Sequence, residues 1–259
     1  MNILKLIGVC LFVNSTPLFA QQANFITNGS ITYEKTVNNY ALIRKGEITG
    51  KNTAGNEQQL LDQYQQTNPQ FKTLKSTLTF NAGQTLFVPI DAEPLTGAGF
   101  NIPISAQNNI IYTDHGTGLM NIKKNLLGDL FLLTDSIRKV NWKITDETRE
   151  VAGYTCRRAN AIVMDSIYVV AFFTERIHVS GGPESFSGLP GMILELALPH
   201  ENVIWKATKI TASQTATSTI IPPKGGKAIN KSEFTMLLKN ITKEQNAKAA
   251  RLFMKTNLL

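Results

Sequence analysis

The stretch Gly181–Leu196, GGPESFSGLPGMILEL, joins a corner rich in glycine and proline to a segment with alternating side chains. We expect Gly181 and Gly182 to supply positive φ for a tight turn. In the GLPG motif that follows, Pro190 favours an extended residue before it, and the flanking glycines allow close backbone approach. From Met192 to Leu198 every even-numbered position is apolar, which predicts a core strand. The stretch therefore predicts a shaped corner that leads into a β-sheet.

Short apolar segments without intervening helices lie on both sides of this corner. In residues 73–81, TLKSTLTFN, Leu74, Ser76, Leu78 and Phe80 share one face and lysine and threonine the other. Such a strand has one solvated side. Six more segments are rich in β-branched, aromatic or leucine residues and are bounded by turn residues: 109–124, 128–145, 149–163, 166–179, 191–198 and 202–212. This order predicts a mainly β fold with an antiparallel meander.

Two parts of the chain have helical periodicity instead. Apolar residues recur at helical spacing in residues 57–66, which predicts a short amphipathic helix. Residues 231–255 have the same spacing with one internal break, which predicts a C-terminal segment of two short helices. Asn230 and Glu233 have the spacing of a capping box at its start. Residues 88–104 contain three prolines and two glycines, so we expect a loop there.

The first residues have the layout of a secretory signal peptide. Residues 1–20 contain one basic residue, an apolar core and Ala20 before a polar pair, so we expect cleavage after Ala20. The remaining residues, 21–259, are then one β-rich domain. We find no second apolar stretch long enough for a transmembrane span. These features predict an exported protein that is periplasmic, associated with the outer membrane, or secreted.

Charge and cysteine content narrow the range of partners. The net charge of +7 fits weak contact with an anionic membrane surface. The sequence has no stripe of aromatic and basic residues of the kind that single-stranded nucleic acid needs, so we expect no nucleic-acid partner. Cys156 is the only cysteine outside the leader, and alternation places it on the same strand face as Arg158. We expect it to be a small buried apolar side chain rather than a reactive thiol.

The sequence carries no recognisable catalytic or cofactor motif. Ser185 and Ser187 do not lie in a GxSxG elbow, and the HExxH, CxxC and P-loop patterns do not occur. The three histidines lack the local spacing of metal ligands. We therefore expect no cofactor and no bound metal. Whether the chain is an enzyme stays open, and a non-catalytic role is favoured.

A few polar residues remain as weak catalytic candidates. Asp114 and His115 end a strand beside two glycines, whereas Glu175 and His178 are expected on opposite faces of one strand, where they cannot cooperate. We favour the interpretation that the first pair are turn residues and that the second pair lie on a solvated strand. Glu184 is the fifth catalytic candidate. The corner could instead hold an anion in a nest of backbone N–H groups, although a structural loop is favoured. The binding candidates are Gly182, Pro183, Gly188, Leu189, Pro190 and Gly191.

Four blocks of sequence in a fixed order resemble one known family. The blocks are WKIT (142–145), ETREVAGYTCRRA (147–159), FFTERI (172–177) and GPESFSGLPGMILEL (182–196). They resemble the GLPGLI family, which comprises exported proteins of Bacteroidota without an assigned activity. GLPGM replaces GLPGL, and Phe172 stands where a tryptophan is expected. The resemblance covers residues 110–210 and implies a curved antiparallel sheet, bowl-like or half-barrel-like, similar to the domain that precedes the catalytic part of a type II peptide N-glycosidase. It brings no catalytic residues.

Three functions stay open at this point. The leading one is an exported envelope protein whose curved sheet binds a small hydrophobic or glycan-like ligand in its concavity, or an envelope partner protein. The second is a hydrolase or metal-dependent enzyme whose site is assembled across strands. The third is a structural interaction module that docks through residues 231–259, in which case deleting those residues leaves the fold intact.

Overall fold

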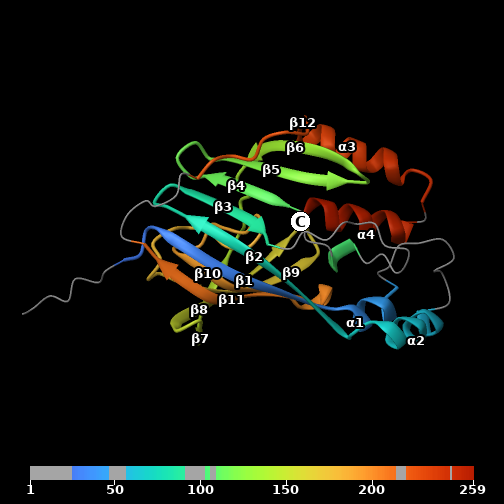
Figure 1. Cartoon of the computed structure of the whole chain (residues 1–259), viewed down its shortest axis with the longest axis horizontal. Coiled ribbons are helices and arrows are strands. Elements are labelled where there is room, and N and C mark those ends of the chain that lie inside the picture. Colours follow the sequence, from blue (N-terminus) through green and yellow to red (C-terminus); the bar gives the residue numbers. More distant parts are fainter. Residues whose placement is uncertain (1–24, 47–56, 91–102, 106–108, 214–219, 246) are drawn as a thin grey trace, which may run out of the picture.

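The computed structural model describes residues 25–46, 57–90, 103–105, 109–213, 220–245 and 247–259. Twelve strands in these residues form one curved sheet, as Figure 1 shows, which confirms the mainly β fold class. The strands are β1 (Gly29–Asn38), β2 (Phe71–Phe80), β3 (Gln84–Pro89), β4 (Ile110–Asp114), β5 (Leu119–Leu126), β6 (Asp129–Ser136), β7 (Lys143–Val151), β8 (Tyr154–Val163), β9 (Ile167–Thr174), β10 (Met192–Leu198), β11 (Val203–Ala212) and β12 (Lys227–Asn230). The predicted leader, residues 1–20, lies outside the described residues.

The strand order is β12-β6-β5-β4-β3-β2-β1-β11-β10-β9-β8-β7. β1 therefore lies in the middle, between one meander that runs from β2 to β6 and another that runs from β7 to β11. Every neighbouring pair is antiparallel except β12 and β6, which are parallel. The predicted meander is confirmed, and the parallel edge strand β12 is an addition that the sequence did not predict.

The core lies against one face of this sheet, which we call the inner face. The predicted alternation in β2 is confirmed, because Leu74, Ser76, Leu78 and Phe80 are all buried while the lysine and threonine residues between them are more exposed. β10 departs from simple alternation, since the pairing register shifts between Ile193 and Glu195 and both faces of the strand are buried. β10 is thus a central strand without a solvated side.

The corner before β10 is shaped by close packing rather than by positive φ at its first residues. The prediction that Gly181 and Gly182 adopt positive φ is wrong, because neither does. A Cβ on Gly182 would lie 2.9 Å from the Cβ of Ile193 and 2.9 Å from the carbonyl oxygen of Phe186. Gly182 is therefore required for space.

The GLPG glycines serve two different purposes. Gly188 has φ +94°, a conformation that favours glycine, and a Cβ there would make only ordinary contact with Trp142. At Gly191 a Cβ would lie 2.2 Å from the carbonyl oxygen of Thr174. The predicted close backbone approach is therefore confirmed at Gly191, whereas Gly188 is needed for its backbone angle.

The helices are α1 (Asn39–Arg44), α2 (Glu57–Thr67), α3 (Lys231–Thr242) and α4 (Ala247–Leu258), with single 3₁₀ turns η1 (Pro103–Ser105) and η2 (Pro199–Glu201). The predicted helix at residues 57–66 is confirmed as α2, one residue longer. The C-terminal segment is confirmed as two helices, and the Asn230–Glu233 capping box forms. α1 was not predicted. The expected loop at residues 88–104 lies mostly outside the described residues.

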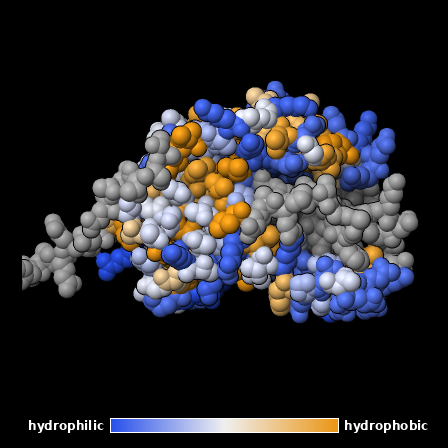
Figure 2. All heavy atoms as spheres, viewed as in Figure 1, coloured by the Kyte–Doolittle hydropathy of each residue, from blue (hydrophilic) through white to orange (hydrophobic). Residues whose placement is uncertain are grey.

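The helices pack on the sheet with their apolar sides. Phe234 and Leu238 of α3 are fully buried and belong to the main core, and Leu252 of α4 is also buried. Figure 2 shows hydrophilic side chains on the outward sides of α2 and α3, at the right of the view. No helix in the described part of the chain is both long enough and apolar enough to span a bilayer.

Candidate functional site

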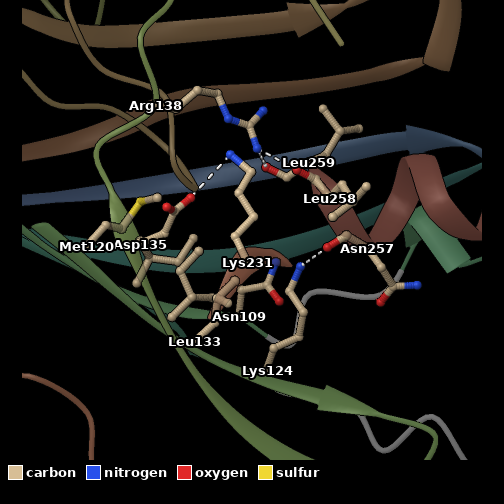
Figure 3. A pocket seen from close by; sticks show the side chains of 12 residues that line it. Asn109, Met120, Lys124, Leu133, Asp135, Arg138, Lys231, Asn257, Leu258 and Leu259 are labelled. Atoms are coloured by element: carbon tan, nitrogen blue, oxygen red, sulfur yellow. Dashed lines mark hydrogen bonds and ion pairs between the residues drawn. The ribbon is translucent and has the colours of Figure 1, made fainter. Parts of the chain in front are cut away.

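A polar cluster lies on the inner face, between the two halves of the sheet, where the end of α4 reaches the corner (Figure 3). Lys124 of β5 donates a hydrogen bond of 2.6 Å to the carbonyl oxygen of Asn257. Arg138 and the Ser185 hydroxyl each donate to the main-chain oxygen of Leu259, at 3.1 Å. Because helix C-termini leave carbonyl oxygens unpaired, these donors satisfy main-chain oxygens at and just after the end of α4.

Little space remains in this cluster. The cavity bounded by these groups has a volume of about 30 Å³, enough for a water molecule rather than a sugar. Burial lowers the pKa of Lys124 to about 8, and it does the same to Lys35 of β1, while the Glu184 carboxylate opposes both shifts. The concavity that the sequence predicted as a ligand site is occupied here by the chain's own α4.

Asp114 and His115 form a turn at the end of β4. One carboxylate oxygen of Asp114 accepts hydrogen bonds from the N–H groups of Gly116 and Thr117, at 2.8 and 3.1 Å. The Thr117 bond is the main reason why the pKa of Asp114 lies below its usual value. Burial lowers the pKa of His115, whose Nε2 has no hydrogen-bond partner among the described residues. These contacts fit the turn role favoured from the sequence.

The other three catalytic candidates lie elsewhere and have separate partners. Glu175 pairs with Arg157 at 3.4 Å, the His178 ring lies 5.2 Å from the ring of Phe25, and Glu184 accepts a hydrogen bond from Asn109 at 3.1 Å. The predicted placement of Glu175 and His178 on one strand is wrong, because β9 ends at Thr174. Among the described residues no hydrogen bond or ion pair joins any two of the five candidates, and no group of three possible ligands could hold a metal ion.

Cys156 is a buried apolar side chain, as the sequence indicated. It is fully buried, and burial raises the pKa of its thiol to about 12. Cys156 pairs with Arg149 of β7, whose guanidinium lies over the ring of Phe172, and Phe172 in turn pairs with Arg158. This register places Cys156 and Arg158 on the same face of β8, as the alternation predicted.

The corner itself uses its backbone donors internally. The N–H of Gly188 donates to the Ser180 hydroxyl at 2.9 Å, and the N–H of Gly191 donates to the carbonyl of Leu189 at 2.8 Å. Gly182, Pro183, Leu189 and Gly191 are buried, whereas Gly188 and Pro190 are exposed. These contacts favour the structural interpretation of the corner over an anion-binding nest.

A row of polar and aromatic side chains lies on the opposite, outer face of the sheet. We call it the outer row and define it as Glu147 of β7, Arg158 and Asn160 of β8, Tyr168 of β9 and His200 of η2. Arg158 pairs with Glu147 and donates through Nε to the amide oxygen of Asn160 at 3.0 Å. The Tyr168 hydroxyl donates to the same oxygen at 3.1 Å. The ring centres of Tyr168 and His200 are 6.3 Å apart.

The outer row is held in place by the sheet but stays accessible. Ala159, Ala161 and Val169 are buried on the inner face, so their neighbours Arg158, Asn160 and Tyr168 point outward, and all three are half-buried. Sequence reasoning did not identify this row. The available signal was the alternation in residues 158–163, which placed polar side chains on one face of a core strand.

A pocket of about 540 Å³ adjoins the outer row at His200. This basic pocket lies between the end of α1, η2, the turn before β9, and α4. Its charged and titratable lining residues are Lys45, His200, Glu201, Lys248, Arg251 and Lys255. The volume is within the usual range for pockets that bind small ligands. The row and the pocket together are the candidate functional site.

A family model described as "N-glycanase peptide, N-terminal domain" matches residues 123–235. The matched segment is less than half of the chain, and it contains the whole outer row. Among curated protein sequences, no relative matches this chain.

Solved structures that are similar to this chain include two of PNGF-II, in space groups P21 and C2. Their sequence identities are 14% and 12% and their TM-scores 0.49 and 0.48, and the matches cover 82% and 89% of this chain. This chain spans 33% of the length of each. An uncharacterized conserved protein from Thermus thermophilus matches with 7% identity and a TM-score of 0.38, over 80% of this chain and 93% of that one.

Proposed function

We propose that this chain is a glycan-binding module of an exported cell-envelope protein and that it binds sugars on its outer row. The single observation that carries the proposal is that this row of polar and aromatic side chains falls within the segment that matches an N-glycanase N-terminal domain. A glycan bound there would contact the sheet's outer face rather than its filled concavity.

The chemistry of the row suits sugar hydroxyl groups, which both donate and accept hydrogen bonds. The Arg158 guanidinium has five N–H donors, and its contacts within the row leave some of them available. The Glu147 carboxylate can accept several hydrogen bonds besides that of Arg158. The Tyr168 ring adds an apolar surface against which the C–H side of a sugar can pack. Because these residues already hold one another, little ordering is needed when a ligand binds.

Two further parts of the proposal rest on sequence. We propose that the chain belongs to the GLPGLI family and that residues 1–20 direct its export to the periplasm, outer membrane or exterior. N-terminal sequencing of the protein purified from its own cell envelope tests the second part. A mature chain that begins at Gln21 supports export, and a retained leader on protein from the cytoplasm contradicts it.

A glycan microarray tests the binding function, with Arg158→Ala and Arg157→Ala as matched variants. The two arginines are adjacent in β8, and each pairs with a glutamate, but only Arg158 belongs to the outer row. We expect wild type and R157A to bind the same glycans. R158A should bind at least about tenfold more weakly, because it loses charge-assisted hydrogen bonds. No bound glycan, or equal loss in both variants, contradicts the proposal.

A further inference from the structure

The basic pocket has an excess of positive charge, which the binding of neutral sugars on the outer row does not explain. Four cationic side chains line it, those of Lys45, Lys248, Arg251 and Lys255, against one carboxylate, that of Glu201. Same-sign charges around a recess concentrate the electrostatic potential inside it and attract ligands of opposite charge. We infer that the pocket binds an acidic substituent of the glycan, a carboxylate or sulfate, while the neutral part of the glycan lies on the outer row.

This inference rests on the proposed glycan-binding function, and it assigns the substrate class. Lys248 and Arg251 are the two residues that can pair with the acidic group. Both are exposed on α4, and neither side chain forms a hydrogen bond or ion pair with another described residue. Arginine in particular matches the planar or trigonal oxygens of such groups with two parallel hydrogen bonds.

Glu201 and Lys255 neutralise each other in the wall of the pocket, so the net positive charge comes from the other cations. Lys255 pairs with one carboxylate oxygen of Glu201 at 3.1 Å. The other oxygen, Oε2, is buried without a hydrogen-bond partner among the described residues, and Glu201 as a whole is only 6% exposed.

The geometry of the pocket keeps these groups together. The ammonium group of Lys45, at the end of α1, donates to the carbonyl oxygen of His200, which fixes η2 against α1. Gly46 has φ +64°, and a Cβ there would lie 2.4 Å from the Lys248 ammonium, so the Lys248 side chain crosses directly over this glycine. The recess thus has a defined lining rather than a set of independent surface lysines.

Two pairs of probes, each an acidic sugar and its neutral counterpart, test the inference by isothermal titration calorimetry. One pair is trigalacturonate and its methyl ester, and the other is 6-sulfo-lactose and lactose. The variant Lys248→Gln/Arg251→Gln removes the pocket's two unpaired cations. The control Lys209→Gln/Lys239→Gln makes the same charge change at exposed positions outside the pocket.

We expect wild type and control to bind the acidic member of at least one pair about tenfold more tightly than the neutral member. The pocket variant should lose that preference and keep the neutral affinity. The pair that shows the preference distinguishes a carboxylate from a sulfate. If no pair shows a preference, or if the pocket variant keeps it, the inference is overturned, whereas glycans bound on the array would leave the proposed function standing.

An anionic lipid surface is the alternative ligand for the basic pocket. Wild type, the pocket variant and the control variant distinguish it from an acidic sugar. Sedimentation with vesicles of phosphatidylcholine and phosphatidylglycerol measures that binding. If the pocket variant loses vesicle binding while the sugar preference is absent, the basic residues serve a membrane and the inference is wrong. We expect vesicle binding to fall equally in the pocket and control variants, because it depends on net charge alone.

Discussion

Arg149 and Glu195 form an ion pair of 2.6 Å, although their strands β7 and β10 are separated in the sheet by β8 and β9. The Arg149 guanidinium also lies 3.9 Å from the centre of the Phe172 ring of β9. The side chain of Glu195 is 9% exposed, so most of its carboxylate is removed from water. The pair therefore ties the edge strand of the sheet to a central strand.

Replacing Arg149 by alanine should destabilise the fold, because the Glu195 carboxylate would stay buried and keep, among the described residues, a single ion pair, with Lys206 at 4.0 Å. We expect a loss of about 1–3 kcal/mol in the free energy of unfolding, measured by urea denaturation. Arg157→Ala is the control, since both members of the Arg157–Glu175 pair are about half exposed. It should change stability by less than about 1 kcal/mol. Equal losses would show that burial of Glu195 is not the cause.

The GLPG corner gives a second prediction at Gly191. In Gly191→Ala the new Cβ would meet the carbonyl oxygen of Thr174 at 2.2 Å, and backbone cannot move aside as a flexible side chain can. We expect a loss of about 2 kcal/mol or more in thermal or chemical unfolding. Gly83→Ala is the control, because a Cβ there meets nothing within 4 Å. A stable G191A protein would refute the close approach of β10 and the end of β9.

The burial of Lys124 should make the free energy of unfolding depend on pH. Burial lowers its pKa to about 8 in the folded protein, against about 10.4 in an unfolded chain. Between these values the unfolded chain binds more protons than the folded one, so stability attributable to Lys124 rises with pH. Relative to Lys124→Met, wild type should gain about 1–3 kcal/mol between pH 8 and pH 10, measured by urea unfolding at each pH.

The control for this series is Lys209→Met, an exposed lysine on β11. Its stability curve should run parallel to that of wild type through the same pH range. A K124M curve that also runs parallel would mean that Lys124 is solvated in the folded protein, and that its contact with the end of α4 is not maintained.

The C-terminal helices are expected to be part of the fold rather than a removable docking surface. Leu238 of α3 is fully buried, so Leu238→Ala should cost about 2–5 kcal/mol through the cavity that it leaves. Met236 on the same helix is 62% exposed, and Met236→Ala should stay within about 0.5 kcal/mol of wild type. If L238A were as stable as M236A, the helix would be loosely attached and the docking hypothesis would be favoured.

Local patterns in the sequence were sufficient to predict most of the fold. The side-chain period of two in residues 73–81 fixes which face of β2 is buried, and helical spacing fixes α2 and α3. The patterns fail where a strand is irregular. In β10 the pairing register shifts between Ile193 and Glu195, and both faces of the strand are buried where the alternation predicted one apolar face.

The candidate site could not be predicted in the same way. The basic pocket joins residues from α1, η2 and α4, which are far apart in sequence and meet only through packing of the helices on the sheet. No single segment of this chain contains enough of the site to form a motif. His200 and Glu201 were within a predicted strand connection, yet nothing in their local sequence indicated that Lys255 would pair with Glu201.

NMR mapping of the purified protein with the glycan that binds most strongly on the array shows which face of the sheet the sugar contacts. We expect the largest chemical-shift changes at the amides of Asn160, Tyr168 and His200, on the outer row, and we expect R158A to abolish them. Changes confined to the inner-face cluster around Lys124 and Arg138, or no change at saturating glycan, would contradict the claim that the outer face of this sheet binds sugars.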